Sequence, residues 1–179
     1  VENVVLTDAL LGGVISGPIE NSDENEDGIL STVLNTTDDL DNSLTLSNTL
    51  YETPFKKLSK TNNTFKLKMN GQSVMKFAIN AIKDSIEKVI KAANLNLTDI
   101  KLIIPHQANQ RIINGAAKSM KIEADKFFCN IHEYGNTSAA SLPIALDEAV
   151  KNKNLQNKDY IILIAFGGGL SSGAILLKW

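Results

Sequence analysis

The chain has 179 residues, of which 43% are hydrophobic, 21% charged and 6% aromatic, and its net charge is −2. This composition is typical of a globular domain with an aliphatic core, and it excludes the overall basic charge of a nucleic-acid-binding protein. No apolar run reaches the ~18 residues of a membrane-spanning helix, and the single cysteine, Cys129, excludes an internal disulfide and favours a reducing, cytoplasmic compartment.

Charge is unevenly distributed along the chain. Residues 1–60 carry 11 acidic and 3 basic side chains, a net charge of −8, whereas residues 61–179 carry 9 acidic and 15 basic side chains, a net charge of +6. Polar runs at 21–27 and 36–42 predict two solvated loops in the acidic part.

Hydrophobic periodicity predicts alternating strands and helices. From Met75 to Ile90, apolar residues recur at steps of three and four, which predicts an amphipathic helix. In chain order, we expect strands at 29–34 and 65–69, a helix at 72–93, a strand at 101–104, a helix at 109–120, a strand at 127–131, a helix at 137–150, and strands at 160–165 and 173–177. This order predicts an α/β domain with helices packed on a mixed sheet.

Three loops lie where ligands collect in such folds, beyond the carboxyl ends of the expected strands. They are 105–109, 134–138 and 166–169. His106 and Asn136, in the first two loops, can both donate hydrogen bonds. Two such donors aimed at one oxygen would stabilise an enolate or oxyanion by ~3–4 kcal/mol each in the best cases. Each feature also has a structural interpretation: a satisfied loop histidine, a helix-capping asparagine, and glycines that allow positive φ.

Two other possible functional patterns, a nucleophile elbow and a zinc site, are excluded by the residues around them. Residues 169–173 match the G-x-S-x-G nucleophile elbow, but a strand-like segment follows and no histidine comes later in the chain. Cys129 and His132 could ligate zinc, but His106 is far from them in sequence, so we expect no metal site.

Three motifs in register resemble the C-terminal half of β-ketoacyl-acyl-carrier-protein synthase III, a thiolase-superfamily enzyme. They are Ile-Ile-Pro-His-Gln-Ala-Asn-Gln-Arg-Ile-Ile at 103–113, Tyr-Gly-Asn-Thr-Ser-Ala-Ala-Ser-Leu-Pro at 134–143 and Ala-Phe-Gly-Gly-Gly at 165–169. The resemblance covers about 65–179. It implies a thiolase-like domain over 29–179, one half of the αβαβα layered fold, preceded by a poorly matched segment with an acidic loop over 1–28.

The resemblance implies a decarboxylative Claisen condensation between an acyl-CoA and malonyl-acyl carrier protein, with no cofactor and no metal. His106 and Asn136 would stabilise the enolate of the malonyl thioester. Phe166 would lie beside this pair, and the Gly168 N–H would complete an oxyanion hole.

The resemblance also implies contacts with the carrier protein. Gln72 and Asn109 would line the route of the pantetheine arm, although Asn is common in the family where Gln72 stands. On the helix after His106, Arg111 and Lys118 fall ~20° apart, and Lys121 falls ~80° from Arg111 if the helix continues. These three basic residues would dock the acidic carrier protein.

The nucleophilic cysteine of the family belongs to the N-terminal half and is absent here. Cys129 lies on the expected strand 127–131 and is interpreted as a buried, inert thiol. We therefore expect a chain that is inactive alone and needs its missing half. We also expect it to self-associate, as the family forms dimers, with 142–146 and 161–165 deep in the core. A secondary-metabolite ketosynthase III, a chalcone-synthase-like enzyme and a non-catalytic carrier-protein-binding module are the alternatives.

Overall fold

The computed structural model describes residues 28–47, 66–152 and 155–179. Its elements are β1 (Gly28–Thr36), β2 (Leu44–Ser47), β3 (Lys66–Met69), α2 (Gly71–Ala92), η1 (Leu97–Asp99), β4 (Ile100–Pro105), α3 (Gln110–Met120), η2 (Ala124–Lys126), α4 (Ile131–Tyr134), η3 (Ser138–Ala140), α5 (Ser141–Asn152), β5 (Tyr160–Gly167) and β6 (Ser171–Lys178), where η marks a 3₁₀ turn. The acidic run 21–27 and almost all of the segment 1–28 lie outside the described residues. No helix in the described ranges is long and apolar enough to cross a membrane.

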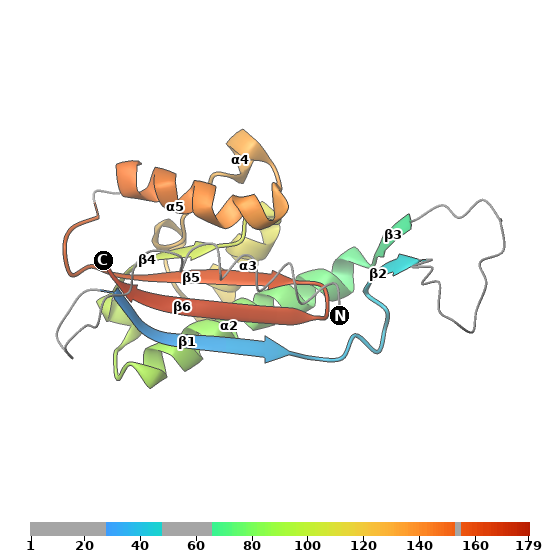
Figure 1. Cartoon of the computed structure of the whole chain (residues 1–179), viewed down its shortest axis with the longest axis horizontal. Coiled ribbons are helices and arrows are strands. Elements are labelled where there is room, and N and C mark those ends of the chain that lie inside the picture. The colour runs from blue at the N-terminus through green and yellow to red at the C-terminus, as the bar shows by residue number, and fades with distance from the viewer. Residues whose placement is uncertain (1–27, 48–65, 153–154) are drawn as a thin grey trace, which may run out of the picture.

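Four strands form a mixed sheet in the order β1-β6-β5-β4, which confirms the expected fold class (Figure 1). The parallel pair is β4 and β5, and β6 is antiparallel to both of its neighbours. Strands β2 and β3 form a separate antiparallel pair that projects from the body of the domain ahead of α2 (Figure 1). Because β4 and β5 are parallel, the loops that follow them leave the sheet at the same edge.

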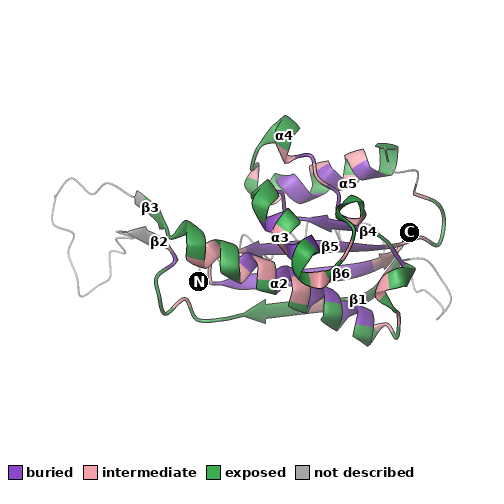
Figure 2. Cartoon of the chain, turned by 180° about the vertical axis from the view of Figure 1, so that it is seen from behind, coloured by how far each residue is buried: buried purple, intermediate pink, exposed green. Residues whose placement is uncertain are grey.

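Helices cover both faces of the sheet, and the alternation of side chains along β5 separates the two cores. Ile162 and Ile164 pack with α2 and α3, whereas Ile161 and Leu163 pack with α5. All four side chains are fully buried, and β5 is coloured as buried over most of its length in Figure 2. Burying an aliphatic side chain of this size contributes ~1.5–3 kcal/mol, so β5 is the central element of the domain.

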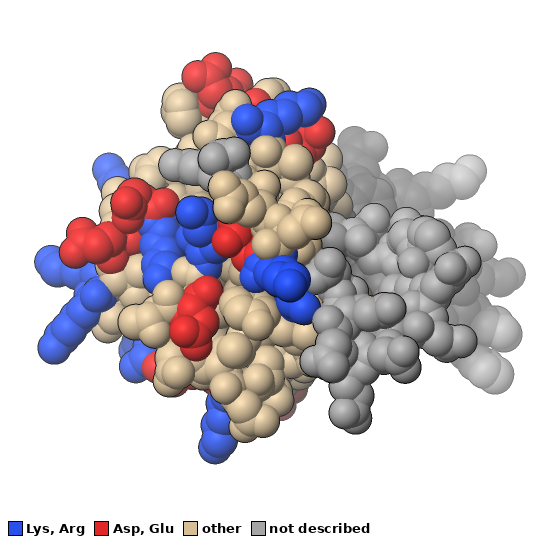
Figure 3. Space-filling model, turned by 90° about the vertical axis from the view of Figure 1, so that its left-hand side faces the viewer, with Lys and Arg blue, Asp and Glu red and all other residues tan. Residues whose placement is uncertain are grey.

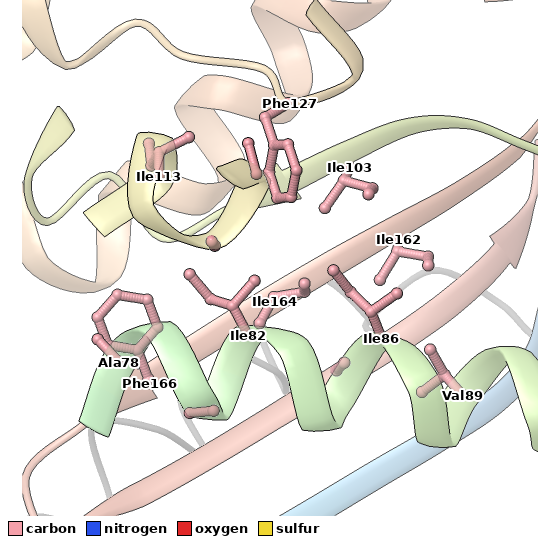
Figure 4. Packing of buried hydrophobic residues seen from close by; sticks show 14 of the residues in the cluster. Ala78, Ile82, Ile86, Val89, Ile103, Ile113, Phe127, Ile162, Ile164 and Phe166 are labelled. Carbon is pink, nitrogen blue, oxygen red and sulfur yellow. The ribbon is translucent and has the colours of Figure 1, made fainter. Parts of the chain in front are cut away.

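Helix α2 packs on the face of the sheet that carries Ile162 and Ile164. Its amphipathic pattern turns Ala78, Ile82, Ile86 and Val89 toward the sheet (Figure 4). Its amino end is capped by Asn70, whose side-chain oxygen accepts from two backbone N–H groups of the first turn. The expected helix over 72–93 is therefore confirmed with small shifts at its ends.

The expected strand over 127–131 is wrong. Only one β-bridge forms, between Ile103 and Phe127, and the segment runs from the end of η2 to Ile131, the first residue of the short helix α4. The physical reason is competition for its backbone groups, because the Gln107 side chain donates to Phe128 O and accepts from Asn130 N–H. These groups are then not available for a ladder with β4.

The helix expected from residue 137 begins regularly only at Ser141. Ser138 has φ +52°, which a regular right-handed helix does not allow, so α5 cannot begin before it. A short 3₁₀ turn over Ser138–Ala140 precedes the helix. The expectation that 142–146 lies deep in the core is correct only for Leu142 and Ala145, and Pro143 is exposed. Helix α5 lies on an outer face of the sheet, so one stripe of it is buried. The segment 161–165 is fully buried, as expected.

Candidate functional site

His106 and Phe166 meet at the edge of the sheet where β4 and β5 end. His106 directly follows β4, and its backbone N–H donates to Ile164 O on β5 over 2.7 Å. Phe166 lies near the end of β5. The two rings contact edge to face, with centroids 5.3 Å apart and planes 66° apart. The parallel register of the two strands thus brings together two of the residues that the sequence singled out.

The His106 imidazole is neutral at physiological pH. The residue is 8% exposed, and burial lowers the pKa of its ring to about 4 because the charged form loses its hydration. Its Nδ1 lies 2.5 Å from Ser141 Oγ. Within the described part of the chain, Nε2 has no hydrogen-bond partner. The ring can therefore offer Nε2 to a ligand at the edge of the sheet.

Gln107 holds the histidine loop against the segment that follows η2. Its Nε2 donates to Pro105 O over 2.7 Å and to Phe128 O over 3.2 Å, and its Oε1 accepts from Asn130 N–H over 3.0 Å. The side chain is 1% exposed. One buried amide thus joins three backbone groups, so the loop that carries His106 is rigidly anchored.

Asn136 lies in the exposed loop between α4 and η3. The loop turns at Gly135, whose φ of +68° is in the region that favours glycine. Asn136 Oδ1 accepts from Ser138 N–H over 2.9 Å. Because this bond identifies the oxygen end of the amide, the Nδ2 end remains to donate to another molecule. Ser141, which contacts His106, follows in the same segment, so the two expected donors are linked through η3.

The third loop connects β5 to β6 as a tight turn. Gly169 has φ +140°, and a Cβ at this position would lie 2.4 Å from Ser171 Oγ, so only glycine fits. Gly168 lies in this turn, one step beyond the end of the strand that carries Phe166. A strand follows the turn, so the G-x-S-x-G match does not form the strand–turn–helix of a nucleophile elbow.

Gln72 and Asn109 are both exposed. Gln72 lies in the first turn of α2, and Asn109 caps α3, its Oδ1 accepting from Arg111 N–H over 2.8 Å. Asn109 therefore has a structural role as the N-cap of α3. No contact joins either side chain to His106 within the described residues.

Helix α3 is amphipathic, as expected. Ile112, Ile113, Ala116 and Ala117 are buried, and Arg111 and Lys118 are exposed.

The expected direction of Lys121 is wrong. Lys121 is the C-cap of α3 and has left-handed backbone angles (φ +54°, ψ +40°), so the helical geometry does not continue to it. It is exposed, but the ~80° angle from Arg111 does not apply.

The end of the molecule opposite the His106 loop, where β4 and β5 begin, carries intermixed basic and acidic side chains (Figure 3).

Cys129 is partly exposed and lies on an irregular segment, so its placement on a buried strand is wrong. Its Sγ donates to Gln110 Oε1 over 2.7 Å, which is its one hydrogen bond within the described residues. No activating base contacts it there. Nor do three His, Cys, Asp or Glu side chains gather in a metal-binding cluster in the described ranges.

Gln107 and Ser141 lie within the motifs at 103–113 and 134–143, but the sequence assigns neither residue a role. Apart from the bond of Gln107 to Pro105 O, their side chains contact residues at least 21 positions away, so no local pattern marks them. Gln107 and Ser141 hold the loop of His106, and His106 and Asn136 each keep one side-chain nitrogen without a hydrogen-bond partner among the described residues.

Comparison with known proteins identifies relatives of the chain. Residues 90–179 match the family model for the C-terminal part of 3-oxoacyl-[acyl-carrier-protein] synthase III. The chain is 52% identical over 120 residues to β-ketoacyl-[acyl-carrier-protein] synthase III of Clostridium novyi, covering 67% of the chain and 37% of that protein. It is 46% identical over 140 residues to the enzyme of the same name from Clostridium beijerinckii, covering 76% of the chain and 42% of that protein.

Solved structures agree with these matches. The crystal structure of 3-oxoacyl-[acyl-carrier-protein] synthase III from Aquifex aeolicus superimposes with a TM-score of 0.73 at 36% identity, over 89% of the chain and 47% of that protein. The Thermus thermophilus enzyme gives a TM-score of 0.74 at 34% identity, over 89% and 48%. The chain therefore spans less than half the length of each of these relatives.

Proposed function

The chain belongs to the family of the 3-oxoacyl-[acyl-carrier-protein] synthase III C-terminal domain, and from this premise we propose that it supplies half the catalytic apparatus of a condensing enzyme that initiates fatty-acid synthesis. The reaction is a decarboxylative Claisen condensation. A cysteine thioester loaded from acyl-CoA is attacked by the carbanion that malonyl-acyl carrier protein yields when it loses carbon dioxide. The nucleophilic cysteine is contributed by the half of the enzyme outside this chain.

His106 and Asn136 stabilise the enolate in this proposal. Loss of carbon dioxide places negative charge on the malonyl thioester oxygen, and N–H donors aimed at that oxygen lower the barrier. The observation that carries the proposal is the neutral, buried His106 imidazole, whose Nδ1 is paired with Ser141 and whose Nε2 has no hydrogen-bond partner among the described residues. A neutral ring donates a hydrogen bond without transferring a proton. The amide orientation at Asn136 supports the same role.

The surrounding residues complete the proposed site. Phe166 packs against His106 and provides an apolar wall that favours expulsion of the charged carboxylate. The Gly168 N–H serves the oxyanion hole of the acyl-cysteine. Gln72 and Asn109, both exposed at helix starts, line the entry of the pantetheine arm. No metal or other cofactor takes part.

The exposed face of α3 docks the acyl carrier protein in this proposal. Arg111 and Lys118 are exposed, and Lys121 adds a third exposed cation just past the helix. The helix begins directly after the His106 loop, so a partner bound on it can deliver its arm toward the site. Acyl carrier protein is acidic in general, so the charges are complementary.

Residues 29–179 form the C-terminal thiolase-like domain in this proposal, and residues 1–28 are a separate leading segment. The missing N-terminal half and a second copy of the enzyme cover apolar surface that this chain exposes. Leu34, Leu67 and Met69 are all more than 60% exposed. Exposed apolar side chains of this size are available for association with another chain, which supports a homodimer of complete enzymes.

The test uses the complete enzyme, in which this chain is joined to a cysteine-bearing N-terminal half. His106→Ala and Asn136→Ala should each slow malonyl decarboxylation by ~100-fold or more, as for other oxyanion donors, and leave acylation of the cysteine unchanged. His132→Ala, an exposed histidine in the same domain, is the matched control. Normal decarboxylation in both variants would reject the enolate role.

A further inference from the structure

Ser141 makes hydrogen bonds that its position in the sequence does not suggest. It is the first residue of α5, and its helical backbone angles (φ −62°, ψ −37°) place it inside the helix and not at the N-cap, so its hydroxyl does not cap its own helix. Here its Oγ lies 2.5 Å from His106 Nδ1 and accepts from Gln107 N–H over 3.2 Å. The residue is 2% exposed. Both hydrogen bonds of its hydroxyl are therefore made to residues of the histidine loop.

The direction of the hydrogen bond to His106 follows from the donors and acceptors present. A hydroxyl has one proton and two lone pairs, and the Gln107 N–H can only donate, so it takes a lone pair of Oγ. Among the described residues, His106 Nδ1 is the one acceptor that the hydroxyl proton can reach. Directing a buried hydroxyl proton anywhere else would leave it unsatisfied, which is costly. The Ser141 hydroxyl therefore donates to Nδ1.

A neutral imidazole that accepts at Nδ1 carries its own proton at Nε2. The two nitrogens of His106 then have different roles, since Nδ1 is paired with Ser141 and Nε2 has no hydrogen-bond partner in the described part of the chain. Contact with Phe166 and the backbone bond to Ile164 prevent the ring and its loop from turning to exchange these roles.

We propose that Ser141 is a positioning residue that holds His106 in the Nε2–H tautomer, so that the ring presents a donor and not a lone pair to its ligand. That the ligand is the thioester oxygen of an enolate rests on the proposed function. In the opposite tautomer, the Nε2 lone pair would face the same negative oxygen and repel it. Ser141 thus determines whether His106 can serve as an oxyanion donor.

The tautomer can be measured directly because the chain has only two histidines, His106 and His132. In the ¹⁵N-labelled chain at pH 7, long-range ¹H–¹⁵N spectra distinguish a protonated ring nitrogen from one with a lone pair. We expect His106 to carry its proton at Nε2. Ser141→Ala should shift it toward a mixture of tautomers, and Ser141→Thr, which keeps the hydroxyl, should not. Ser85→Ala, at another buried serine, is the matched control.

A proton at Nδ1 in the unsubstituted chain overturns the proposal without any variant. So does an unchanged His106 tautomer in Ser141→Ala whose backbone amide spectrum shows a folded chain. The measurement on the unsubstituted chain decides the question even where Ser141→Ala fails to fold.

A second measurement separates this proposal from the proposed function. In the complete enzyme, Ser141→Ala should slow malonyl decarboxylation about tenfold, the size expected from loss of one orienting hydrogen bond, and leave cysteine acylation unchanged. Ser141→Thr should restore most of the rate. Full activity in His106→Ala would reject the proposed function and leave the tautomer result standing. If His106→Ala decarboxylates malonyl-acyl carrier protein slowly while Ser141→Ala does so at the normal rate, only the positioning role is rejected.

Discussion

Replacing Gln107 by leucine tests how strongly one buried side chain holds the histidine loop. Leucine matches glutamine in size but removes all three hydrogen bonds, so Pro105 O, Phe128 O and Asn130 N–H lose their side-chain partner in a buried environment. A buried backbone group left unsatisfied costs ~1–3 kcal/mol. Local relaxation recovers part of this, so we expect a total loss of ~3 kcal/mol in the free energy of unfolding.

The loss can be measured by urea unfolding followed by circular dichroism. A change of this size lowers the melting temperature of a chain this long by ~6–12 °C. Gln156→Leu, at an exposed position, is the matched control. Hydrogen exchange at the Asn130 amide should also become faster, because its acceptor is gone. If Gln107→Leu were within ~0.5 kcal/mol of Gln156→Leu, with Asn130 still protected, the role assigned to Gln107 would be wrong.

Four further outcomes are expected. Because burial lowers the pKa of His106 from 6.5 to about 4, the unfolded chain binds its proton more readily, so stability falls by roughly 2 kcal/mol as the pH drops from 7 to 5. Urea unfolding at both pH values should show this loss in His132→Gln but not in His106→Gln, and equal losses would contradict it. Thr137 Oγ1 is buried without a partner among the described residues, so Thr137→Val should keep or raise the urea midpoint; a loss above ~1 kcal/mol would show a missed bond. In the complete enzyme, Arg111→Glu should weaken carrier-protein binding and flatten its salt dependence, with acyl-CoA loading nearly unchanged. Equal losses with carrier protein and with malonyl-CoA would instead indicate a folding defect. The chain alone, incubated with acetyl-CoA and malonyl-acyl carrier protein, should form no product, and mass spectrometry should detect no adduct; an acyl group on Cys129 would overturn its interpretation as inert.

The sequence by itself determined the elements whose signal is local. The spacing of Ile82, Ile86 and Val89 predicts the buried stripe of α2, and the apolar run 161–165 predicts the central strand. Such patterns depend only on which residues face the same side of a helix or strand, so neighbours in the sequence are sufficient. His106 and Asn136 were also identified as candidate donors from their residue types and their loops.

Only the tertiary structure decided how these residues are held. The bond from Ser141 to His106 spans 35 positions, and Gln107 reaches 21 and 23 positions to Phe128 and Asn130. Long-range polar contacts of this kind leave no periodic trace in the sequence. The same contacts overrode the local signal at 127–131. An apolar run predicted a strand there, but the buried amide of Gln107 forms hydrogen bonds with Phe128 O and Asn130 N–H. Local patterns set which face of each element is apolar, but the packing of those faces sets which polar groups become buried and must pair.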